Sequence, residues 1–155
     1  MYTIRNIVVT TDFSAYSATA LEYARVLAIK TNANIHLVHV ITEPRPHDES
    51  AAEEQMNKFI GEHVDEYTYI RHAVRTGNPA KEILRYAAEN DAALIIIATH
   101  GRTGLAHILL GSVAENIVRL SPIPVMTVKP AEFLTPLITD SEVARELHLS
   151  DDPTV

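Results

Sequence analysis

Five apolar residues, Leu94-Ile95-Ile96-Ile97-Ala98, stand in an unbroken run, and a loop that carries Gly101, Gly104 and Gly111 follows them. A continuous apolar run of this length is typical of a parallel strand that helices cover on both faces. Neighbouring parallel strands need long crossover connections, which are usually helices. The run therefore predicts an α/β protein built on a parallel sheet.

Strand and helix patterns alternate on both sides of this run. Four further strands are expected at residues 7–11, 35–41, 67–74 and 124–129. Helices are expected between them, because apolar residues recur at helical spacing in the segments that join successive strands. Repeated strand–helix order implies right-handed crossovers and one parallel sheet.

Three positions have the pattern of a helix start. Ser14 follows the first strand and is a candidate N-cap, and Asn78-Pro79 places proline at the first helical position. Ser112 stands three residues before Glu115, which is the spacing of a capping box, so we expect Ser112 to cap the helix that ends near Leu120.

Composition limits the classes of function. The chain has 155 residues, which fits one domain, and no cysteine, which excludes disulfides and Cys-ligated metal sites. A formal net charge of −7 disfavours non-specific nucleic-acid binding and binding to anionic membranes. No apolar run is long enough for a transmembrane helix, and the first six residues lack a signal-peptide pattern. We therefore expect a cytoplasmic protein with no membrane or nucleic-acid partner.

Two loops are candidates for a binding site. Residues 10–14 follow the first strand and residues 98–112 follow the fourth. In open parallel sheets, ligands bind beyond the carboxyl ends of the strands where the strand order reverses. Gly111-Ser112 stands at a helix start, where free amides and the helix dipole favour an anion. Gly101 and Gly104 are equally compatible with ordinary turns.

These loops, with His39-Val40-Ile41 at the end of the second strand, resemble the universal stress protein family, most closely its ATP-binding branch. That branch carries Gly, two residues, Gly, nine residues, and then Gly-Ser or Gly-Thr. Here Ala98-Thr99-His100-Gly101 is followed by nine residues and then Gly111-Ser112, so the spacing fits. Ala98 replaces the first glycine, and Thr10 stands where the branch often has proline. The resemblance covers about residues 3–130.

The resemblance implies an ATP site, and Mg²⁺ would enter bound to the phosphates of the nucleotide. Because the histidines are scattered along the chain, we expect no metal site built from protein side chains. Asp12 and Val40 would line the adenosine. The residues expected along the phosphates are Ala98, His100, Gly101 and Arg102, and residues 111–113 would hold the terminal phosphates. The expected binding residues are Thr10, Thr11, Asp12, Val40, Ala98, His100, Gly101, Arg102, Gly111, Ser112 and Val113.

Together with the strand–helix alternation, the resemblance implies a flavodoxin-like three-layer sandwich with a five-stranded parallel sheet in the order 3-2-1-4-5. Residues 1–130 would form the nucleotide-binding domain and residues 131–155 a C-terminal extension of it. In the family, the last strand mediates homodimers, so we expect pairing through Val125–Val128. The implied function is an ATP-binding stress-response sensor or adaptor without catalytic residues.

Two alternatives within the family stay open. One is a dimeric interaction module that binds no nucleotide, and the other is a slow ATPase switch for which His100 is the candidate base. The chain lacks the sequence motifs of other nucleotide-binding and signalling families. The chain has no Gly-Lys-Ser/Thr P-loop, no dinucleotide fingerprint after the first strand, and no acidic pair of the kind a receiver domain needs.

Overall fold

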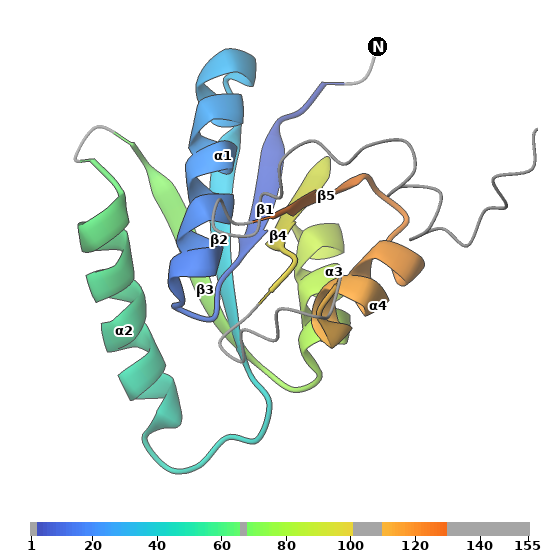
Figure 1. Cartoon of the computed structure of the whole chain (residues 1–155). Coiled ribbons are helices and arrows are strands. Elements are labelled where there is room, and N and C mark those ends of the chain that lie inside the picture. Colours follow the sequence, from blue (N-terminus) through green and yellow to red (C-terminus); the bar gives the residue numbers. More distant parts are fainter. Residues whose placement is uncertain (1–2, 66–67, 101–109, 130–155) are drawn as a thin grey trace, which may run out of the picture.

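The computed structural model describes residues 3–65, 68–100 and 110–129, and Figure 1 shows how they are arranged. One five-stranded sheet lies at the centre, in the order β3-β2-β1-β4-β5, and each neighbouring pair of strands is parallel. The predicted sheet and its order are therefore confirmed. The strands are β1 (Asn6–Thr10), β2 (Asn34–Ile41), β3 (Ile70–Thr76), β4 (Leu94–Ala98) and β5 (Val125–Val128).

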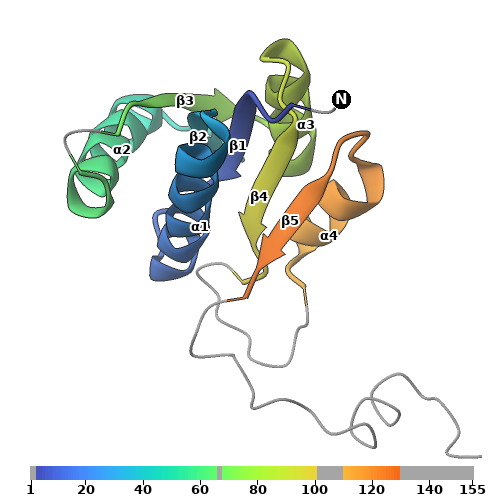
Figure 2. The same cartoon turned by 90° about the horizontal axis from the view of Figure 1, so that it is seen from above.

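Helices cover both faces of the sheet and give three layers (Figure 2). Helices α1 (Ala15–Thr31) and α2 (Asp48–His63) pack on one face, and α3 (Pro79–Glu89) and α4 (Ser112–Leu120) pack on the other. Side chains of a strand alternate between the faces. Ile7 and Val9 accordingly join the core beneath α1 and α2, whereas Val8 joins the core beneath α3 and α4. All three side chains are fully buried.

Two of the predicted helix starts are confirmed by their hydrogen bonds. The Ser17 amide donates to Oγ of Ser14 at 3.3 Å, and the Lys81 amide donates to Oδ1 of Asn78 at 3.0 Å. Pro79 occupies the first helical position of α3. These caps satisfy amides that have no partner inside their helices, so they fix where α1 and α3 leave the loops at the carboxyl edge of the sheet.

The third strand differs from its prediction. It was expected at residues 67–74, whereas β3 extends from Ile70 to Thr76. It is an edge strand, and Arg71 and His72 are both exposed, so its sequence lacks the apolar run that marks an interior strand. Its bounds follow from pairing with β2, in which Ile35 lies opposite Ile70 and Ile41 lies opposite Thr76.

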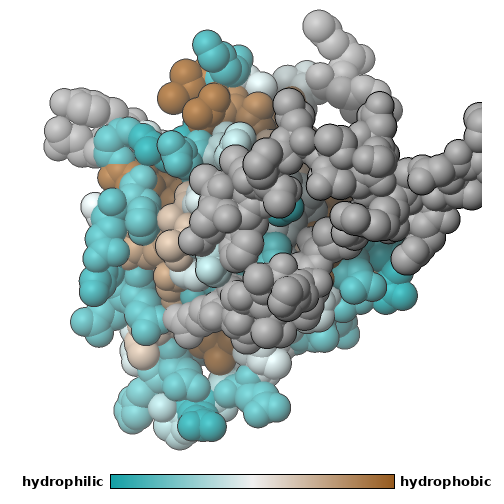
Figure 3. All heavy atoms as spheres, in the orientation of Figure 1, coloured by the Kyte–Doolittle hydropathy of each residue, from teal (hydrophilic) through white to brown (hydrophobic). Residues whose placement is uncertain are grey.

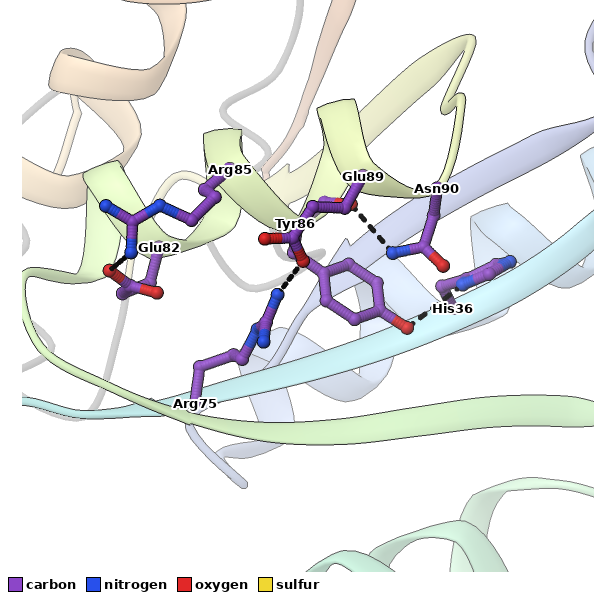
Figure 4. A network of polar contacts seen from close by, with 7 residues as sticks. All are labelled: His36, Arg75, Glu82, Arg85, Tyr86, Glu89 and Asn90. Carbon is purple, nitrogen blue, oxygen red and sulfur yellow. Dashed lines mark hydrogen bonds and ion pairs between the residues drawn. The ribbon is translucent and has the colours of Figure 1, made fainter.

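A buried polar contact joins β2 to α3 (Figure 4). Nδ1 of His36 and the hydroxyl of Tyr86 are hydrogen bonded at 3.1 Å, and both side chains are buried. The guanidinium of Arg75 lies 5.2 Å from the centre of the Tyr86 ring and pairs with Glu89. Burial, with a smaller contribution from Arg71, lowers the pKa of His36. The imidazole is therefore neutral at neutral pH.

Part of α1 presents apolar side chains to the surface. Val26 and Ile29 are exposed there, Ile29 to 75%, and Figure 3 shows hydrophobic surface at the upper end of the molecule, where α1 ends. Within the described residues, no helix has the length and apolar character needed to cross a membrane.

Candidate functional site

A cleft of about 330 Å³ opens at the carboxyl ends of β1 and β4. The sheet order reverses between these two strands, and the volume lies within the range of small-molecule sites. The structure brings nine of the eleven predicted binding residues to this cleft; Gly101 and Arg102 lie outside the described residues. The nine are Thr10, Thr11, Asp12, Val40, Ala98, His100, Gly111, Ser112 and Val113.

The two residues that depart from the family pattern are the last residues of regular strands. Ala98 ends β4 in register with Val128, and Thr10 ends β1 in register with Val38. Neither residue has a positive φ. The methyl group of Ala98 therefore requires no left-handed backbone, which is the conformation that would have demanded glycine.

The start of α4 differs from its prediction. Gly111, not Ser112, is the N-cap, no side chain caps the helix, and Ser112 is its first helical residue. The reason is a close approach between backbones: the Gly111 amide donates to the Thr99 carbonyl at 2.8 Å. A Cβ at Gly111 would lie 3.2 Å from that oxygen, which is tighter than ordinary contact. A side chain at position 111 would therefore be crowded against the carbonyl oxygen of Thr99.

The first backbone amides of α4 lie at the cleft and have no acceptor within the helix. The first backbone hydrogen bond of α4 runs from the Glu115 amide to the Gly111 carbonyl at 2.9 Å. The amides of Ser112, Val113 and Ala114 precede it, and all three residues line the cleft. Free amides and the positive end of the helix dipole favour an anion. This end of the cleft can therefore bind phosphate or carboxylate.

The loop after β1 forms the opposite wall, and its polar groups are already paired. The hydroxyl of Thr11 is hydrogen bonded to that of Ser17 at 2.9 Å and accepts the Phe13 amide at 2.9 Å. Oδ1 of Asp12 accepts the amide and the hydroxyl of Ser14, at 3.0 and 2.5 Å. These bonds hold the Asp12 carboxylate at the cleft wall.

Phe13 is in the left-handed region, with φ 64°. This conformation costs a non-glycine residue about 1–2 kcal/mol. Its ring packs against the imidazole of His39, with centroids 4.3 Å apart, and meets Phe59 of α2 edge-on at 6.0 Å. Strained residues persist where their surroundings hold them, and they cluster at functional sites.

His100 follows β4 by two residues and lines the cleft. It is buried, and its Nδ1 is hydrogen bonded to the hydroxyl of Thr99 at 2.8 Å. In the described part of the chain, no group of three or more His, Asp or Glu side chains is placed to hold a metal ion.

Nine residues that line the cleft were not among the predicted binding residues. Asn78-Pro79 did carry a signal, because a helix that starts directly after a parallel strand begins at the same edge of the sheet. His39 is the first residue of the run His39-Val40-Ile41 that was compared with the family, but its side chain was given no role. The missed lining residues are Ser17, Val38, His39, Thr42, Pro79, Ile83, Ile97, Thr99 and Ala114.

Comparison with known proteins agrees with this architecture. The profile of the universal stress protein family matches residues 3–129. The universal stress protein MJ0531 of Methanocaldococcus jannaschii is 31% identical over 140 residues, covering 81% of this chain and 82% of the relative.

Two solved structures are similar in fold and sequence. Protein MJ0577 of the same organism superposes with a TM-score of 0.69 at 28% identity, covering 83% of this chain and 98% of that one. A universal stress protein in complex with cAMP superposes with a TM-score of 0.63 at 26% identity and the same coverage. With the family profile matched over nearly all described residues, this chain belongs to the universal stress protein family.

Proposed function

We propose that this protein binds ATP, together with Mg²⁺, in the cleft at the ends of β1 and β4, and that the bound nucleotide sets its activity as a cytoplasmic stress-response sensor or adaptor. The observation that carries the proposal is the convergence of two features on one cleft. Asp12 lies on one wall, and on another lie the amides at the start of α4, which have no backbone partner among the described residues.

Backbone donors fit this ligand. None of the described lining residues is Lys or Arg, so a phosphate in this part of the cleft would be bound by the amides of Ser112, Val113 and Ala114. Helix N-termini bind phosphates in this way. A Mg²⁺ ion would enter with the phosphates, since nucleotide-bound Mg²⁺ needs few protein ligands.

A related structure supports the ligand class. The universal stress protein that was solved with cAMP is 26% identical and covers most of this chain. Cyclic AMP carries the adenine and ribose of ATP, so we transfer the adenine nucleoside to the end of the cleft near Asp12 and Val40. The triphosphate then extends toward α4.

Calorimetric titration with Mg·ATP and Mg·GTP tests the proposal. We expect ATP to bind and GTP to bind more weakly. In Asp12→Asn, one oxygen can still accept the bonds from Ser14 that order the loop, but the second oxygen becomes an amide nitrogen that cannot accept a hydrogen bond from the nucleoside. ATP affinity should therefore fall by about tenfold. Asp91→Asn is the matched control, because Asp91 is exposed and is absent from the cleft. No heat and no thermal shift with millimolar ATP would refute the proposal in favour of a nucleotide-independent module.

We also propose that two copies pair through β5. This strand lies at one edge of the sheet, and Thr127 is exposed on it. An edge strand presents backbone groups to which another strand can bind. The expected assembly is a two-fold dimer with antiparallel β5 strands. Light scattering at micromolar concentration should give twice the chain mass, and a monomer mass would contradict the proposal.

A further inference from the structure

Thr11, the residue before Asp12, is hydrogen bonded to β2 through both its amide and its carbonyl group. The Thr11 amide donates to the Val38 carbonyl at 2.9 Å. The Thr11 carbonyl lies 2.8 Å from Nδ1 of His39. Because a carbonyl oxygen can only accept, Nδ1 of His39 carries the proton of this bond. The side chain of His39 therefore fixes the carbonyl that immediately precedes Asp12.

The same imidazole also contacts the residue that follows Asp12. Its ring packs on the Phe13 ring with centroids 4.3 Å apart and an interplanar angle of 31°. Phe13 has the left-handed backbone described above, and its amide donates to the Thr11 hydroxyl. One side chain from the neighbouring strand thus holds both residues that flank Asp12.

We infer that His39 is a positioning residue for nucleotide binding. It holds Thr11 by a hydrogen bond and Phe13 by ring packing, and so fixes the direction in which the Asp12 carboxylate faces the cleft. This inference rests on the proposed nucleotide site. His39 lines the same cleft, so its role is exerted within the site and not from a distance.

Three substitutions separate the two contacts. His39→Phe keeps a ring against Phe13 but has no donor for Thr11. His39→Asn places its amide nitrogen where Nδ1 lies and so keeps the donor without the ring. His39→Gln carries its amide nitrogen one atom further from the backbone, where it no longer matches Nδ1.

The experiment measures two quantities for each variant. Amide hydrogen exchange at Phe13 and Ser14, without ligand, reports whether the loop is held. Calorimetry with Mg·ATP reports affinity. We expect faster exchange and about tenfold weaker binding in His39→Phe and His39→Gln, and substantial recovery of both in His39→Asn. His72→Phe is the matched control, since His72 is an exposed histidine of β3 that is absent from the cleft, and it should change neither quantity.

Each outcome bears on the inference. If His39→Phe shows the same amide exchange and the same ATP affinity as the wild type, the inference is wrong. It is also wrong if the exchange in His39→Phe is faster but the affinity is unchanged. If His39→Phe does not fold, the Asn and Gln variants decide, and equal affinities in those two overturn it. If wild-type protein binds no nucleotide, the proposed function fails and this inference fails with it. The ligand-free exchange data then still show whether His39 holds the loop, so the two failures are distinguishable.

Discussion

Replacing Tyr86 with Phe removes one hydroxyl from the buried contact between β2 and α3. That hydroxyl is hydrogen bonded to Nδ1 of His36 at 3.1 Å. His36 is only 1% exposed, and its other ring nitrogen, Nε2, has no hydrogen-bond partner among the described residues. The substitution therefore leaves an imidazole buried with neither nitrogen bonded.

The expected cost follows from that orphaned ring. A buried polar group that loses its partner costs about 1–3 kcal/mol of the free energy of unfolding. For a chain of this size, 1 kcal/mol corresponds to about 2–4 °C in Tm. Tyr86→Phe should therefore lower Tm by several degrees in thermal unfolding followed by circular dichroism at neutral pH. Tyr23→Phe, at a half-exposed tyrosine on α1, is the control and should leave Tm almost unchanged.

A second variant separates the hydrogen bond from packing. Combining His36→Leu with Tyr86→Phe replaces both polar partners by apolar groups, which is nearly neutral when the shapes fit. The double variant should thus be more stable than Tyr86→Phe alone. If Tyr86→Phe has the same Tm as the wild type and Tyr23→Phe, the hydrogen bond contributes nothing to stability and this account of the contact is wrong.

Three further predictions concern stability. Burial lowers the pKa of His36 below its ordinary 6.5, so below pH 6.5 the unfolded chain binds a proton that the folded chain excludes. The free energy of unfolding, measured by urea titration, should therefore fall as the pH drops below 6.5. His36→Leu should reduce this fall. Gly61 of α2 has open space around it, so Gly61→Ala should stabilise by about 0.5–1 kcal/mol, whereas Gly111→Ala should lower Tm because its Cβ meets the Thr99 carbonyl. Asn78→Ala should cost about 1 kcal/mol through the lost cap on α3, measured by chemical denaturation, and no loss would contradict the capping role.

The interior of the fold was predictable because its strands are covered on both faces. β4 has the predicted bounds, Leu94–Ala98, since every residue of it is buried and apolar. β3 was misplaced because an edge strand with exposed Arg71 and His72 has no apolar run, and its length is set by pairing with β2. The C-terminal extension expected at residues 131–155 lies outside the described residues.

The candidate site was predictable in its location but not in its local geometry. Loop position after β1 and β4 follows from the order of elements alone. The cap at Gly111 was missed because the Ser112 to Glu115 spacing matched a capping box, whereas a backbone contact with Thr99 decides where α4 begins. The left-handed Phe13 could not be foreseen, because an aromatic residue does not favour that region, and the ring of His39 that packs on it comes from another strand.

The measurement that tests the nucleotide site most directly is a titration of ¹⁵N-labelled protein with Mg·ATP, followed by amide chemical shifts. Binding as proposed should shift the amides of Ser112, Val113 and Ala114 together with those of Thr11 and Asp12, along one saturable curve. Mg²⁺ alone should leave these amides unchanged. Absence of shifts at both walls of the cleft, or saturable shifts confined to residues outside it, would contradict the proposed nucleotide site.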